Sequence, residues 1–145
     1  MYRAHPRPGR RTCDDASRAR GPSATQVVEL ANGPVEYRLD RRDGPAAVVL
    51  LHGGHLRAGP PRGEEVSAAA GCTVLAPSRP GCGRTPVSTG TSPTGFAGAV
   101  SGLCAHLGIQ RVDAVAGVSA GGPTAVAPAA LHPALVRKVP LLSLR

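Results

Sequence analysis

The sequence predicts an α/β fold of three layers, in which helices cover a mostly parallel sheet. Short apolar runs rich in valine alternate along the chain with segments whose apolar residues recur every three or four positions. The apolar runs are continuous, which is typical of strands buried on both faces of a parallel sheet. Because the expected strands from residue 46 onward alternate with helical segments, they connect through helices packed on the sheet.

The N-terminal half holds four expected strands and one helix. The first two strands flank Asn32-Gly33-Pro34, a cluster of turn-forming residues. The expected elements are strands at 26–30, 35–39, 46–51 and 72–76 and a helix at 63–70. A loop rich in glycine and proline, at 78–93, follows the fourth strand.

The C-terminal half continues the alternation. A helix is expected at 95–107, because Phe96, Val100, Leu103 and Leu107 recur at spacings of three and four. Gly98 and Gly102 weaken this helix by roughly 1 kcal/mol each relative to alanine. The remaining expected elements are a strand at 112–118, a helix at 120–131 and a strand at 139–144.

Composition and charge indicate whether the protein binds nucleic acid, spans a membrane or holds a metal. The net charge is +8, and residues 1–24 read as a disordered basic leader ahead of one domain at 25–145. Nothing resembling a nucleic-acid-binding module accompanies the leader, so nucleic acid is not the expected partner. No apolar stretch reaches membrane-spanning length, and the four cysteines lack metal-site or disulfide spacing. We therefore expect a cytoplasmic protein without a metal or cofactor.

The residues with the clearest chemical meaning are Gly117-Val118-Ser119-Ala120-Gly121. A serine between glycines, placed after an apolar strand and before an alanine-rich helix, is typical of a nucleophile elbow. The glycines leave room for a tight turn around Ser119. The helix that follows directs free amides and a positive dipole end at the reacting centre.

Three motifs, in order along 25–145, resemble the α/β-hydrolase family. The segment from Val48 to Gly54 is similar to the family's strand and oxyanion loop, and the segment from Pro77 to Thr85 to its arginine-proline-glycine loop. The elbow around Ser119 is the third motif. The resemblance implies the N-terminal portion of that fold, truncated before its last strands.

The resemblance also implies a mechanism and a site. Ser119 would be the nucleophile, and the amides of Ala120 and Gly54 would form the oxyanion hole, with His55 the near alternative to Gly54. A serine at the elbow favours acyl transfer to water from an ester-type small molecule over epoxide opening. His52 is interpreted as a structural residue of the loop, and Arg79 and Arg84 as braces of theirs.

Several departures from the family count against activity of this chain alone. The residues after Ser119 include no Asp or Glu and one histidine, His132, which we do not expect to be catalytic. Ser78 stands where the family often has an aspartate, and Pro128 falls inside the last helix. The apolar segment 139–144 would lie at a sheet edge, open to self-association.

Two alternatives therefore remain open. The chain could be a non-catalytic half-domain or interaction protein that presents segment 139–144 to a partner. It could also bind nucleic acid through the basic leader, in which case salt would weaken the binding.

Overall fold

The computed structural model describes residues 24–54, 57–58 and 69–142. The expected basic leader lies outside these residues, apart from Ala24. The expected helix at 63–70 also lies almost wholly outside them.

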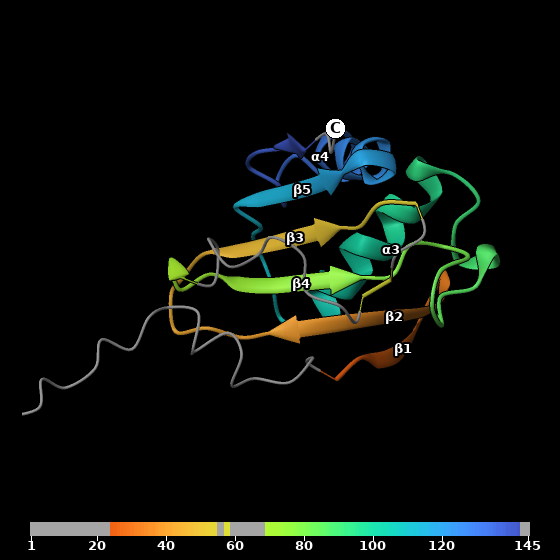
Figure 1. Cartoon of the computed structure of the whole chain (residues 1–145), viewed down its shortest axis with the longest axis horizontal. Coiled ribbons are helices and arrows are strands. Elements are labelled where there is room, and N and C mark those ends of the chain that lie inside the picture. Colours follow the sequence, from red (N-terminus) through yellow and green to blue (C-terminus); the bar gives the residue numbers. More distant parts are fainter. Residues whose placement is uncertain (1–23, 55–56, 59–68, 143–145) are drawn as a thin grey trace, which may run out of the picture.

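A six-stranded sheet forms the centre of the protein (Figure 1), in the order β1-β2-β4-β3-β5-β6. β1 and β2 form an antiparallel hairpin, and β2 runs antiparallel to β4. The pairs β4–β3, β3–β5 and β5–β6 are parallel. The strands are β1 (Gln26–Leu30), β2 (Gly33–Asp40), β3 (Ala47–Leu51), β4 (Thr73–Pro77), β5 (Ala114–Val118) and β6 (Leu141–Leu142).

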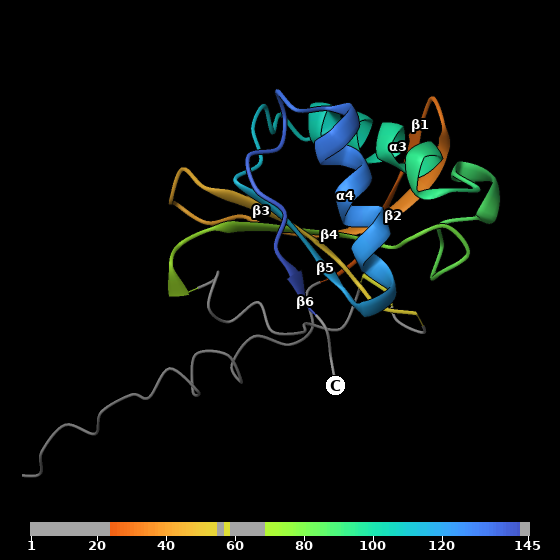
Figure 2. The same cartoon turned by 90° about the horizontal axis from the view of Figure 1, so that it is seen from above.

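Two helices, α3 (Pro93–His106) and α4 (Gly122–Leu131), lie side by side on the same face of the sheet (Figure 2). The parallel strands require such crossovers, because each chain segment must return to the starting edge of the sheet before the next strand. The α/β class and the mostly parallel sheet predicted from the sequence are therefore confirmed.

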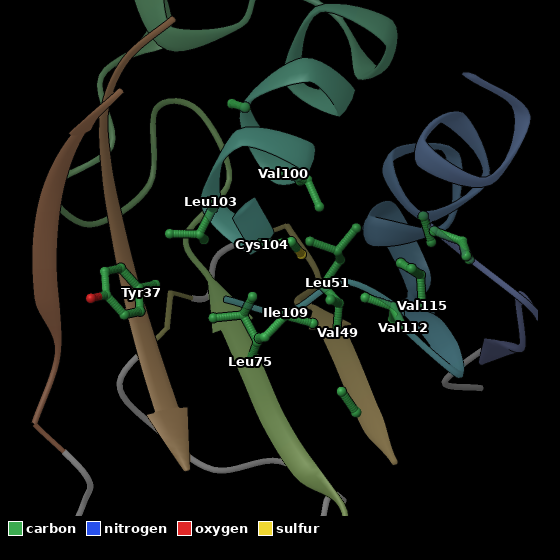
Figure 3. Packing of buried hydrophobic residues seen from close by; sticks show 14 of the residues in the cluster. Tyr37, Val49, Leu51, Leu75, Val100, Leu103, Cys104, Ile109, Val112 and Val115 are labelled. Carbon is green, nitrogen blue, oxygen red and sulfur yellow. The ribbon is translucent and has the colours of Figure 1, made fainter. Parts of the chain in front are cut away.

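The core lies between these helices and the sheet (Figure 3). Val49 and Leu51 of β3 meet Val100 and Leu103 of α3 there, and all four are at most 1% exposed. Within β3, burial alternates, so Val48 and Leu50 on the opposite face are only partly buried. The prediction of burial on both faces holds for β4, which is buried at every position, but is wrong for β3.

The helix starts differ from those expected because of local capping and turn geometry. α3 begins two residues early, since the Ser92 hydroxyl accepts a hydrogen bond from the Gly95 amide at 3.1 Å and Pro93 occupies the first turn. α4 begins two residues late, because Ser119–Gly121 form a 3-10 turn first. A second 3-10 turn, Val87–Thr89, interrupts the loop expected at 78–93.

The last two strands are shorter than the sequence suggested. β5 starts at Ala114, because Val112 makes only an isolated bridge with Val136 and the Asp113 carboxylate accepts a hydrogen bond from the Ala47 amide at 2.9 Å. β6 covers two residues of the expected 139–144, and 143–145 lie outside the described residues.

α4 continues through Pro128, which is buried. Proline inside a helix costs about 3 kcal/mol, so packing against the core offsets this local penalty. Among the described residues, no helix is both long and apolar enough to cross a bilayer.

Candidate active site

Ser119 lies in a sharp turn between β5 and α4. Its φ is 50°, and it is the only residue other than glycine with a positive φ in the part of the chain that the structure describes. This left-handed conformation costs a residue with a side chain roughly 1–2 kcal/mol. Ser119 and Ala120 are both exposed at the turn. The backbone therefore holds a serine side chain out of the sheet at an energetic cost, as a nucleophile elbow does.

Gly117 and Gly121 make this turn sterically feasible. A Cβ at Gly117 would lie 2.6 Å from the Gly121 carbonyl oxygen and 2.8 Å from the Ala125 Cβ. A Cβ at Gly121 would lie 2.7 Å from the His52 carbonyl oxygen and closer still to that of Leu51. Any side chain at either position would force the strand, the turn and the helix apart.

The oxyanion loop predicted from the sequence, 52–54, lies beside the elbow. β3 and β5 are parallel neighbours in which Leu51 pairs with Gly117, so both strands end at the same edge of the sheet. Gly54, three residues after Leu51, is exposed, and a Cβ there would meet no described residue within 4 Å. The fold thus brings Gly54 and Ala120 to the edge that carries Ser119.

The His52 side chain holds this loop in place through hydrogen bonds at both ring nitrogens. It is 8% exposed; its Nε2 accepts a hydrogen bond from the Arg79 amide at 2.9 Å, and its Nδ1 lies 2.7 Å from the Gly53 carbonyl oxygen. Because Nε2 accepts, Nδ1 carries the proton and donates to Gly53. Burial, assisted by the charge of Arg79, lowers the pKa of His52 against the opposing effect of the Gly53 bond. A neutral ring with both nitrogens occupied is not available as a base.

The arginine-proline-glycine loop reaches the elbow through Arg79. The Arg79 guanidinium donates a hydrogen bond to the Ala120 carbonyl oxygen at 3.1 Å. Arg79 is therefore bonded both to the oxyanion loop, through its amide, and to the elbow, through its side chain.

A buried carboxylate, Glu36, anchors the same loop. Its oxygens accept hydrogen bonds from the Ser78 hydroxyl and from Nε of Arg84, each at 2.7 Å, and Glu36 is 2% exposed. Burial alone would raise the pKa of Glu36, but the bonds from Arg84 and Ser78 and the charge of Arg84 hold it below its usual value. Arg84 thus braces the loop, and Ser78 binds the carboxylate that Glu36 supplies.

Sequence reasoning missed Glu36. It lies in the alternating stretch Val35-Glu36-Tyr37, in which period two assigns the glutamate to solvent. In the structure these three residues are all buried, because the loop at 78–85 covers the second face of β2. No local pattern marked Glu36, because its partners Ser78 and Arg84 lie 42 and 48 positions away in the sequence.

The remaining described histidines do not reach the elbow. His106 ends α3, and His132 follows the end of α4. Because α4 starts at the elbow and its ten residues rise about 15 Å, His132 lies toward the amino ends of the parallel strands, away from the elbow at their carboxyl ends. His55 lies outside the described residues. Within those residues, no group of three or more Cys, His, Asp or Glu side chains lies together as a metal site would require.

Comparison with known proteins agrees with this fold. The family model described as the alpha/beta hydrolase fold matches residues 46–144, well over half of the chain. The chain therefore belongs to the α/β-hydrolase family. An uncharacterized hydrolase of Bacillus subtilis (strain 168), YcgS, is 30% identical over 118 residues. That match covers 81% of this chain and 40% of the relative.

Solved structures lead to the same family. An alpha/beta hydrolase fold protein from Nakamurella multipartita is 27% identical with a TM-score of 0.67, over 83% of this chain and 40% of that one. The enol-lactonase from Burkholderia xenovorans LB400 is 26% identical with a TM-score of 0.67, over 79% and 45%. The epoxide hydrolase CorEH is 26% identical with a TM-score of 0.66, over 81% and 41%. The chain thus spans about two fifths of the length of these relatives.

Proposed function

We propose that Ser119 is the nucleophile of a serine hydrolase that acts on carboxylic ester-type bonds. The observation that carries the proposal is the left-handed backbone of an exposed serine, at a turn that only glycines at 117 and 121 permit. Family membership supports hydrolysis in general. The residue type supports ester chemistry, because a serine alkoxide attacks a carbonyl carbon and forms an acyl-enzyme that water then cleaves.

The oxyanion hole in this proposal consists of the amides of Gly54 and Ala120. Attack on a carbonyl moves negative charge onto its oxygen, and preorganised amides stabilise that charge without reorganising. The parallel pairing of β3 with β5 brings both amides to the edge of the sheet where Ser119 is exposed.

A general base and its orienting carboxylate complete such a mechanism. Neither is available among the described residues: His52 is occupied on both nitrogens, and His106 and His132 lie toward the other edge of the sheet. The buried Glu36 is committed to Ser78 and Arg84. We therefore expect residues 1–145 alone to hydrolyse p-nitrophenyl acetate barely above background.

The first test is a p-nitrophenyl acetate assay on two samples. One is residues 1–145, and the other is the longest polypeptide in which the gene's reading frame continues past Arg145. We expect turnover in a polypeptide that supplies the base, and Ser119→Ala should lower it by on the order of a millionfold. Ser88→Ala, at an exposed serine of the 3-10 turn Val87–Thr89, is the matched control. Turnover that survives Ser119→Ala would overturn the proposal.

Gly54 offers a second test within the same assay. Gly54→Pro removes the amide proton, and loss of one oxyanion donor lowers kcat by about 10²–10³. Gly54→Ala keeps the amide and places its Cβ more than 4 Å from every atom of the described residues beyond its two chain neighbours, so it should retain activity. Equal activity of the two variants would exclude the Gly54 amide as a donor.

A further inference from the structure

Arg79 makes hydrogen bonds to two segments that are far apart in sequence. Its amide donates to Nε2 of His52 at 2.9 Å, and its guanidinium donates to the Ala120 carbonyl oxygen at 3.1 Å. We propose that Arg79 is a positioning residue that joins the oxyanion loop 52–54 to the elbow at 119–121. Its catalytic consequence rests on the proposed function, but the joining itself does not.

The contact with His52 fixes the oxyanion loop. The His52 ring passes the constraint on, since its other nitrogen donates to the carbonyl of Gly53 at 2.7 Å. The peptide unit that contains this carbonyl also contains the Gly54 amide. Arg79 thus restrains the orientation of the Gly54 N–H through one imidazole ring.

The contact with Ala120 fixes the elbow from the other side. The Ala120 carbonyl belongs to the peptide unit that follows the Ala120 amide, so the Arg79 bond restrains rotation about the two backbone bonds of Ala120 that join these units. The unit that contains the Ala120 amide is itself held, because the Gly122 N–H donates to the Ser119 carbonyl. Without the guanidinium, the turn loses the bond to the Ala120 carbonyl and keeps only the bond from the Gly122 N–H to the Ser119 carbonyl.

Arg79 can transmit a restraint only if it is itself held in place, and Ser78 does this. The Ser78 amide donates to the Glu36 carbonyl at 2.8 Å, and its hydroxyl donates to the Glu36 carboxylate at 2.7 Å. Ser78 is completely buried. The buried pair therefore anchors the backbone directly before Arg79 to β2.

Backbone order parameters measured by ¹⁵N relaxation on residues 1–145 test the proposal. Arg79→Met keeps most of the side-chain stem and removes the donors. We expect the order parameter of the Ala120 amide to fall from about 0.85 toward 0.6 or lower. The Gly54 amide should stay rigid, because its link to Arg79 runs through the Arg79 backbone N–H, which methionine keeps. The amides of Val49 and Val115 in the core should also stay unchanged. Arg79→Lys, which keeps a cationic donor, should restore the Ala120 value.

Arg41→Met is the matched control, because Arg41 also donates to a backbone carbonyl, that of Leu107 at 2.8 Å, but away from the elbow. It should leave the Gly54 and Ala120 amides unchanged. The proposal is wrong if Arg79→Met leaves the Ala120 amide rigid, if it loosens Val49 and Val115 equally, or if Arg79→Lys fails to restore order.

The catalytic consequence is measured separately in a polypeptide that turns over p-nitrophenyl acetate. Arg79→Met should lower kcat about tenfold at unchanged KM, because the Ala120 amide acts on the transition state. Loss of order without loss of kcat would contradict the oxyanion role of Ala120 and leave the joining role of Arg79 intact.

Discussion

Ser119 combines an exposed side chain with a backbone conformation that serine adopts reluctantly. The cost of roughly 1–2 kcal/mol is met by neighbours that leave no alternative: glycine at 117 and 121, and the Gly122 amide bonded to the Ser119 carbonyl. Strain retained in this way at an exposed residue is the signature expected of a functional position.

Glu36 makes the stability of the fold sensitive to acid. Its folded-state pKa lies below the ordinary value of 4.5, so its charge stabilises the fold above that pH. This contribution fades as the pH falls from 4.5 through the folded-state value. We expect Glu36→Gln to lower stability at pH 7 by about 1–3 kcal/mol and to flatten the loss in acid, as measured by urea unfolding from pH 7 to 3.

Glu29→Gln is the control for Glu36→Gln, since Glu29 is an exposed glutamate on the neighbouring strand β1. It should leave both the stability at pH 7 and the slope in acid near wild type. An equally steep acid slope in Glu36→Gln would show that other groups are responsible.

The unit of β5, turn and α4 depends on close backbone packing more than on side chains. Gly117→Ala would place a methyl group 2.6 Å from the Gly121 carbonyl oxygen, so we expect it to destabilise the protein by about 1–3 kcal/mol in thermal or urea unfolding. Ser119 should lose its left-handed backbone, visible in the ¹³C chemical shifts of that residue.

Gly102→Ala in α3 is the matched control for the elbow glycine. A Cβ there would lie 3.8 Å from Leu30 Cδ1, an ordinary contact, and alanine favours the helix by about 1 kcal/mol. It should therefore be neutral or stabilising. Equal effects of Gly102→Ala and Gly117→Ala would contradict a special role for the elbow packing.

On the scale of the whole molecule, the sheet has an edge at β6, which pairs with β5 on one side and has no second strand neighbour among the described residues. We propose that residues 1–145 self-associate through segment 139–144, because the open edge of β6 within it can pair with another chain. Apparent mass in light scattering should rise with concentration. Leu142→Lys should suppress the rise.

Val126→Lys adds the same charge at a residue of α4 that is 45% exposed, and so controls for a general effect of charge. It should leave association unchanged. A mass that is independent of concentration in the unmodified protein, or suppression by both variants, would exclude the edge as the contact.

The order of the described strands and α-helices from 26 onward and the turn at Ser119 were predicted from the sequence, while the expected helix at 63–70 stays a prediction. Apolar runs and glycine spacing are local patterns, so they can be recognised in the sequence without knowledge of the fold. The element ends were less accurate where a single group decides them, such as the Ser92 cap of α3 or the Asp113 bond to the Ala47 amide.

The sequence by itself determined the α/β class, the elbow and the glycines that surround it, because each depends on residues close together in the chain. Only the tertiary structure decided that Glu36 is buried beneath Ser78 and Arg84, and that Arg79 links His52 to Ala120. These contacts join residues separated by 27 to 48 positions. Such pairings are set by the register of neighbouring strands and the path of a loop, which no periodicity along the chain records.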